Sequence, residues 1–133
     1  MGVRRDRPIV CIVEDDVSFR SALTSLLCAH GFHVEAYPCA QSFLQKLQAG
    51  RLSCAALVLD IHLGTLSGFD VYDRLTTSKH VIPTIFMTGR DDTVTRRRAA
   101  RVGASAYLVK PFEDAVLLRA VRGALGSVTD RSS

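Results

Sequence analysis

Three acidic residues stand in a row near the start of the sequence, directly after a short apolar run. They are Glu14, Asp15 and Asp16, and the run before them spans residues 9–13. Carboxylates crowded at the end of a buried strand repel one another and resist the loss of their hydration. A hard divalent cation is the simplest group that offsets both costs, so this triplet predicts a cation site.

Three other apolar runs also end in polar or special residues. In chain order these are Asp60 after 56–59, Thr88 and Gly89 after 84–87, and Lys110 and Pro111 after 106–109. Each is weak evidence alone, because every strand must end and polar residues often mark that end. Their joint occurrence is a strong signal that several strand ends contribute to one site.

Such a site needs a scaffold of alternating strands and helices, which the hydrophobic pattern provides. We predict strands at 9–13, 33–37, 56–59, 84–87 and 106–109. Apolar residues at helical spacing predict helices from an Asp16 cap to Gly31, around 43–47, around 69–75, at about 92–102, and at about 113–125. Five strand and helix alternations imply a parallel sheet with helices on both faces. Ligands of such sheets bind at the carboxyl ends of the strands, where the strand order reverses.

Size and composition limit the possible classes of protein. The chain has 133 residues, of which 47% are hydrophobic and 23% are charged, and this suits one domain with one core. No apolar run approaches the roughly 20 residues of a membrane span, and the amino terminus leads into no secretory core. We therefore expect a soluble cytoplasmic protein without membrane contact. The four cysteines lack metal-ligand spacing, so we interpret them as buried free thiols without a function.

The formal net charge is +4, and the basic excess lies in the second half of the chain. Its densest part is the cluster Arg96, Arg97, Arg98 and Arg101. One short basic cluster without a helix-turn-helix or an aromatic stacking surface is weak evidence for nucleic-acid binding. We expect no direct nucleic-acid binding and favour a solvated helix face or an acidic protein partner.

Four sequence segments carry a resemblance to a known family. They read IVEDDVSFR, LVLDIHLGTLSG, PTIFMTG and GASAYLVKPF, in that order. Their order and spacing resemble the receiver domain of bacterial two-component response regulators over about residues 8–126. The resemblance implies a flavodoxin-like (βα)5 fold, with five parallel strands and helices on both faces. We expect residues 1–133 to form a single receiver domain without an output domain.

The resemblance assigns the acidic residues to phosphoryl transfer. Asp60 matches the phosphoacceptor, whose carboxylate attacks the phosphorus of a phosphohistidine on a sensor histidine kinase or phosphotransfer protein. Asp15 matches the carboxylate that binds Mg²⁺ directly, and Glu14 the one that acts mostly through water. Mn²⁺ can substitute for Mg²⁺. The backbone carbonyl of His62 matches the remaining metal ligand, and Asp16 is left as the helix cap.

Three further residues acquire roles by the same resemblance. Lys110 matches the lysine that pairs with the phosphoryl group, and a cis bond to Pro111 would aim it into the site. Thr88 matches the hydroxyl that donates to a phosphoryl oxygen, with Gly89 beside it. Tyr107 matches an aromatic switch, which would rotate inward once phosphorylation draws Thr88 inward. The fourth helix, fifth strand and fifth helix would then present the output surface to a second copy or a downstream protein.

Three positions fall outside the usual family pattern or vary within it. Gly64 stands where the family usually has proline, and glycine allows a positive φ and a less rigid loop. His62 and Arg90 lie two residues beyond Asp60 and Thr88, beside the path of the hydrolytic water in this family. We expect them to tune the lifetime of the phosphorylated form, in a direction that the sequence does not fix.

Two function classes stay open at this point. The main hypothesis is a Mg²⁺-dependent phosphoacceptor that catalyses only its own phosphorylation and dephosphorylation, and is not a dedicated enzyme. The alternative is a receiver-like module that works through protein contacts without phosphorylation. A phosphatase with an aspartyl nucleophile would need a DxD arrangement after the first strand, and Asp15 is followed by Asp16 and Val17. A flavin-binding fold would need a phosphate loop where the acidic triplet stands.

Overall fold

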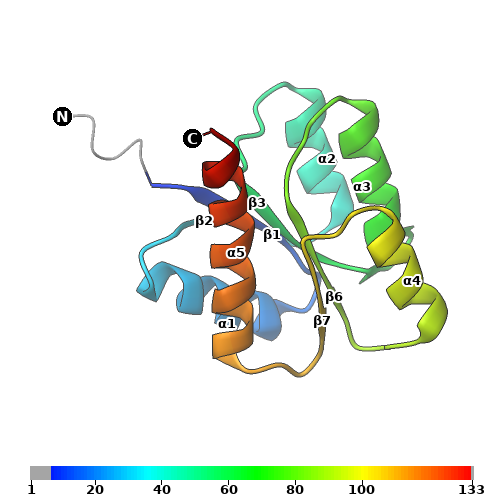
Figure 1. The fold of residues 1–133 in the computed structure, drawn as a ribbon. Coiled ribbons are helices and arrows are strands. Elements are labelled where there is room, and N and C mark those ends of the chain that lie inside the picture. Colours follow the sequence, from blue (N-terminus) through cyan, green and yellow to red (C-terminus); the bar gives the residue numbers. More distant parts are fainter. Residues whose placement is uncertain (1–6, 133) are drawn as a thin grey trace.

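A five-stranded parallel sheet forms the centre of the molecule in this computed structural model, which describes residues 7–132 (Figure 1). The strand order is β2-β1-β3-β6-β7. The strands are β1 (Ile9–Val13), β2 (His33–Tyr37), β3 (Ala56–Asp60), β6 (Thr84–Thr88) and β7 (Ala106–Val109). The helices are α1 (Val17–Ala29), α2 (Ala40–Gln48), α3 (Gly68–Thr77), α4 (Thr93–Arg101) and α5 (Asp114–Ser132). The predicted doubly covered parallel sheet is confirmed.

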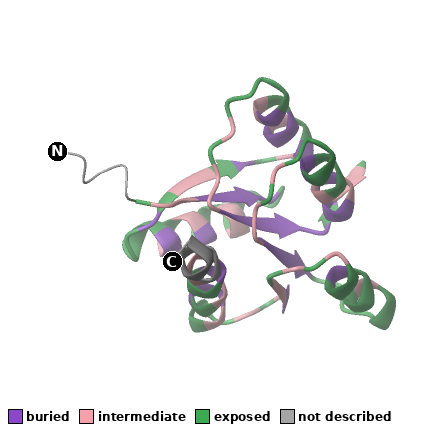
Figure 2. Cartoon of the chain, turned by 45° about the horizontal axis from the view of Figure 1, so that its top comes forward, coloured by how far each residue is buried: buried purple, intermediate pink, exposed green. Residues whose placement is uncertain are grey.

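The central strands are apolar because both of their faces are covered. Every residue of β3 and β6 is buried, and so are four of the five residues of β1 (Figure 2). Such strands cannot alternate apolar and polar side chains, which is why they read as continuous apolar runs in the sequence. The edge strand β2 is mostly half-buried or exposed and has the mixed sequence HVEAY.

Two layers of helices cover the sheet. Helices α1 and α5 contribute to one apolar cluster, and α2, α3 and α4 contribute to the other, on the opposite face of the sheet (Figure 1). Leu27 and Leu117 are fully buried in the first cluster, and Phe43 and Phe86 are fully buried in the second. Because all five strands run parallel, their carboxyl ends share one edge of the sheet.

Helix starts follow local hydrogen-bonding rules. Asp16 caps α1, because its Oδ1 accepts a hydrogen bond from the backbone N–H of Phe19 at 2.8 Å. Helix α3 begins with a capping box in which Ser67 and Asp70 each accept a bond from the other's backbone N–H. The cap predicted at Asp16 is confirmed, and Gly31 follows the end of α1 with φ of 91°.

Three details differ from the sequence interpretation. A hairpin of β4 (His62–Leu63) and β5 (Leu66–Ser67) follows β3, and its two-residue strands are too short to leave a hydrophobic pattern. Helix α5 extends to Ser132, beyond the predicted end near Leu125. All four cysteines are free, but the expectation of buried thiols is wrong for Cys28, which is exposed, and holds fully only for Cys11, because Cys39 and Cys54 are half-buried. Within residues 7–132, none of the helices combines the length and the apolar character that crossing a membrane requires.

Candidate functional site

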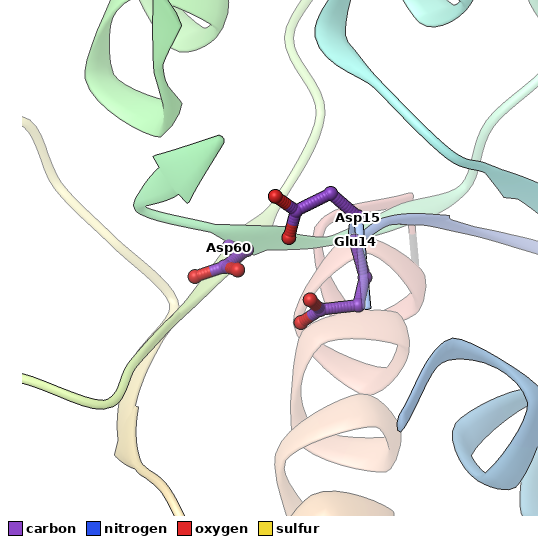
Figure 3. A group of neighbouring side chains, drawn as sticks. All are labelled: Glu14, Asp15 and Asp60. Atoms are coloured by element: carbon purple, nitrogen blue, oxygen red, sulfur yellow. The ribbon is translucent and has the colours of Figure 1, made fainter. Parts of the chain in front are cut away.

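Three carboxylates meet at the point where the strand order reverses. Val13 of β1 pairs with Leu59 of β3, so the residues that follow them, Glu14 and Asp60, lie side by side at the sheet edge. Asp15 adds a third carboxylate, and one ligand oxygen of each residue lies within 4.8 Å of the others. Figure 3 shows the three side chains leaving β1 and β3 toward the same space. Glu14 and Asp60 are 1% and 4% exposed, whereas Asp15 is open to solvent.

Glu14 is the most deeply buried of these acids. Burial raises the pKa of Glu14, and hydrogen bonds from Lys110 and from the backbone N–H of Asp16 only partly offset that effect. The bond from Lys110 Nζ to Glu14 Oε1 is 2.7 Å long, and the bond from Asp16 N to Oε2 is 3.0 Å long. Both carboxylate oxygens of Glu14 are therefore engaged within the protein.

Lys110 reaches the cluster from the end of β7. Its Nζ lies 2.7 Å from Glu14 and 3.3 Å from Asp60 Oδ2, and it joins the two acids across 96 and 50 residues of sequence. Burial lowers the pKa of Lys110, but the hydrogen bond with Glu14 and the charge of Asp60 outweigh it and leave the pKa raised. The Lys110–Pro111 peptide bond is cis, as the resemblance implied.

Asp60 is held by its own loop and by the start of α3. Its Oδ1 accepts a hydrogen bond from the backbone N–H of His62 at 3.2 Å. Gly68 packs directly on the backbone here, because a Cβ at this position would lie 2.5 Å from the carbonyl oxygen of Asp60. Sequence reasoning missed this role of Gly68, although the glycine stands in the quoted segment LVLDIHLGTLSG and follows a helix-capping serine.

Gly64 makes the tight turn of the β4–β5 hairpin. Its φ is 87°, which proline cannot adopt because its ring fixes φ near −65°. A proline at position 64 could therefore not adopt this backbone conformation. The hairpin and Arg90 border a cavity of about 400 Å³, with His62, Asp70 and Gly64 among its lining residues.

Thr88 ends β6 and is fully buried, but its hydroxyl is turned to its own loop. The hydroxyl donates to the carbonyl oxygen of Arg90 at 3.1 Å and accepts from the backbone N–H of Arg90 at 2.9 Å. Among the described residues no hydrogen bond joins this hydroxyl to Asp60. Thr88 therefore lies at the correct strand end, in a local turn that would have to open before its hydroxyl could serve the site.

Tyr107 is tied to the loop that precedes α4. Its hydroxyl donates to Asp91 Oδ1 at 3.0 Å, Arg96 forms an ion pair with Asp91, and the Arg96 guanidinium lies 5.3 Å from the centroid of the Tyr107 ring. Burial and the hydrogen bond to Asp91 raise the pKa of Tyr107 to about 12. The sequence analysis named Tyr107 and counted Arg96 in the basic cluster, but it missed the contacts of Tyr107 with Asp91 and Arg96, which no motif marks.

The structure thus brings together Glu14, Asp15, Asp60 and Lys110, and it places Thr88 one strand away. A pocket of carboxylate oxygens beside one ammonium group matches the coordination chemistry of a hard divalent cation. Asp15 is exposed, so the pocket is open to solvent on that side and a molecule from solution can approach it there.

Comparison with known proteins agrees with this architecture. A family model described as the response regulator receiver domain matches residues 10–122, and the chain belongs to this family. It is 43% identical over 115 residues to nodulation protein W of Bradyrhizobium diazoefficiens, covering 86% of this chain and 50% of that protein. It is 36% identical over 117 residues to the response regulator protein TmoT of Ectopseudomonas mendocina, covering 88% of this chain and 52% of that protein. The chain therefore spans about half the length of these curated relatives.

Solved structures give the same result. The crystal structure of a response regulator receiver protein from Burkholderia phymatum is 35% identical, with a TM-score of 0.81 over 90% of this chain and 96% of that one. The protein is a receiver domain of two-component signalling, a class that acts with histidine kinases or phosphotransfer proteins. The flavodoxin-like fold expected from the sequence is confirmed.

Proposed function

We propose that this chain accepts a phosphoryl group on Asp60 from a phosphohistidine of a sensor histidine kinase or phosphotransfer protein. The observation that carries the proposal is the position of Asp60, which is buried between an exposed carboxylate on one side and the Lys110 ammonium at 3.3 Å on the other. A strand-end aspartate that only capped a turn would need neither neighbour.

Mg²⁺ fits the donor set of this site, and Mn²⁺ would fit it as a substitute. Asp15 and Asp60 would hold the ion directly, Glu14 through water, and the backbone carbonyl of His62 would complete the protein ligands. Support comes from the three carboxylates whose ligand atoms lie within 4.8 Å of one another. When bound, the ion would offset the negative charge of the incoming phosphoryl oxygens.

The residues of the chain perform the transfer in a simple sequence. One carboxylate oxygen of Asp60 attacks the phosphorus in line with the donor nitrogen, so that a P–O bond forms as the P–N bond breaks. Lys110 exchanges part of its contact with Glu14 for a phosphoryl oxygen, and it can do so because its ammonium already lies between Glu14 and Asp60. Thr88 then leaves the carbonyl of Arg90 and donates its hydroxyl to another phosphoryl oxygen.

The movement of Thr88 would reach Tyr107 through the loop between β6 and α4. Arg90 and Asp91 are neighbours in that loop, and Asp91 accepts the hydrogen bond of Tyr107. A displaced loop would therefore release the ring from Asp91 and let it turn inward. The face formed by α4, β7 and α5 would change with it, and we propose that a second copy or a downstream protein reads this face.

The setting of this function is part of the same proposal. The chain would work as one receiver domain, with its core at about 8–126, and it would turn over only its own phosphoryl group, without acting as a dedicated enzyme. Its four free cysteines support a reducing compartment, and we therefore propose the cytoplasm.

The decisive experiment incubates the protein with phosphoramidate and Mg²⁺ and measures the intact mass. We expect the addition of one phosphoryl group, no addition after chelation of the metal, and no addition in Asp60→Asn. Asp73→Asn is the matched control, because Asp73 is an exposed aspartate on α3 away from the cluster. Phosphorylation of Asp60→Asn at the wild-type level would refute the assignment and would favour the alternative of a phosphorylation-independent module.

A further inference from the structure

One aromatic side chain touches the site without any polar contact to it. The Nζ atom of Lys110 lies 4.6 Å from the centroid of the Phe19 ring, over its face. Glu14 and Asp60 hold the same ammonium group through hydrogen bonds of 2.7 and 3.3 Å. The Lys110 side chain is therefore enclosed by two carboxylates and one aromatic ring, with 22% of its surface exposed.

The Phe19 ring is itself held in place. It packs edge-on against Phe112, with ring centroids 5.7 Å apart and an angle of 71° between the planes. Phe112 lies two residues beyond Lys110, so the chain that carries the lysine also braces the ring. The backbone N–H of Phe19 is fixed by the Asp16 cap, and both rings pack on the apolar cluster between the sheet and α1 and α5.

An aromatic face differs from a polar neighbour in how it holds an ammonium group. The ring quadrupole attracts a positive charge that lies within about 6 Å of the ring centroid, without accepting a directed hydrogen bond. The three N–H groups of Lys110 thus stay available to oxygen atoms. A contact of this kind limits where the ammonium can move and leaves its choice of acceptor open.

We propose that Phe19 is a positioning residue for Lys110, and that its ring keeps the ammonium at the edge of the carboxylate cluster while the lysine exchanges Glu14 for a phosphoryl oxygen. The inference rests on the proposed function of Lys110. Phe19 touches neither the acceptor nor the phosphoryl group, and it acts only through the lysine. An aliphatic residue of similar size would fill the same space but would not hold the charge.

The first test asks whether the contact exists in solution. The chain has three lysines, Lys46, Lys79 and Lys110, so protein with ¹³C-labelled lysine gives a simple NMR spectrum of the methylene groups next to nitrogen. We expect the Lys110 protons to be shifted upfield by the ring current, and the shift to vanish in Phe19→Leu and persist in Phe19→Tyr. Exposed Lys79 is the internal reference. Identical Lys110 shifts in the wild type and Phe19→Leu would overturn the inference, whatever the outcome for Asp60.

The second test measures the rate of phosphorylation by phosphoramidate with Mg²⁺. We expect Phe19→Leu to be about three- to tenfold slower than the wild type, the range that a cation–π contact can support, and Phe19→Tyr to recover most of the rate. Leu26→Ala controls for lost packing, because Leu26 lies about two turns beyond Phe19 on the same helix and packs on the same apolar cluster. We expect it to lower stability and leave the rate near that of the wild type.

These outcomes separate the inference from the function on which it rests. A wild-type rate in Phe19→Leu, or a Phe19→Tyr variant as slow as Phe19→Leu, would show that the ring only packs and would leave Asp60 as the acceptor. A wild-type protein that takes up no phosphoryl group would refute the proposed function instead, and the lysine NMR shifts would still report on the contact.

Discussion

Gly68 offers a sharp test of how closely the acceptor is held. A Cβ added there would lie 2.5 Å from the carbonyl oxygen of Asp60, whereas ordinary contact begins at 3.4 Å. The Asp60 backbone and the start of α3 must therefore separate by up to 0.9 Å, the difference between these two distances. The contact involves backbone on both sides, so no flexible side chain can move aside to relieve it.

We expect Gly68→Ala to affect stability and chemistry together. Overpacking of this kind costs about 1 to 3 kcal/mol, and a Tm loss of several degrees follows for a domain of this size. A displacement close to 1 Å at a reacting group can slow a reaction by on the order of 100-fold, so we expect phosphorylation of Asp60 to fall at least tenfold. Urea unfolding and phosphorylation rates below the Tm of the variant measure the two effects separately.

The control is another glycine in a helix. Gly123 lies in α5 with nothing within 4 Å of its added Cβ, so Gly123→Ala should gain roughly 0.5 to 1 kcal/mol from better helix propensity and leave phosphorylation unchanged. Wild-type stability together with a wild-type rate in Gly68→Ala would refute the claim that the start of α3 fixes the acceptor. A stability loss without a rate loss would restrict the role of Gly68 to packing.

Three further predictions follow from the site. Burial and the hydrogen bond to Asp91 raise the pKa of Tyr107 to about 12, so the stability that goes with neutral Tyr107 should be complete below the usual tyrosine pKa and be lost as pH rises through about 12. Asp91→Ala should lower the pH at which Tyr107 ionises in an ultraviolet titration. Mg²⁺ should raise the Tm of the wild type but not of Asp15→Asn, because ligand binding to the folded state adds stability by mass action. Replacement of His62 and Arg90 by alanine should change the decay rate of the phosphorylated protein severalfold, and unchanged decay would remove both from the path of the hydrolytic water.

The sequence predicted the strands and the acidic cluster well because both follow from burial. Strand β3 is buried on both faces and reads as an uninterrupted apolar run, so its end, and with it Asp60, could be located to within one residue. Lys110 could be placed at the same edge of the sheet because parallel strands end together. Periodicity and the family resemblance thus located residues that lie up to 96 positions apart.

The missed features depend on contacts that no local pattern encodes. The bond from Tyr107 to Asp91 requires knowing which way a half-buried ring turns, and the approach of Gly68 to Asp60 requires the path of a hairpin with two-residue strands. Phe19 reads as one more apolar residue on the inner face of a helix, and only the structure shows Lys110 over its ring. Such side-chain and loop details are decided by tertiary packing after the elements have formed.

The balance of charge explains why Lys110 can serve the site both before and after phosphorylation of Asp60. Lys110 neutralises only one of the three carboxylates, so a divalent cation would bring the site near neutrality before transfer. Phosphorylation replaces the single charge of Asp60 with the larger charge of an acyl phosphate, so the site is again short of positive partners. Hydrogen-bond donors must then supply the difference, and Thr88 at the end of the neighbouring strand β6 offers a hydroxyl that Arg90 holds in the resting state. We therefore expect the shortage of positive charge around phosphorylated Asp60 to draw the Thr88 hydroxyl away from Arg90 and so open the 88–90 turn. The displaced loop would then act on Tyr107 through its hydrogen bond to Asp91.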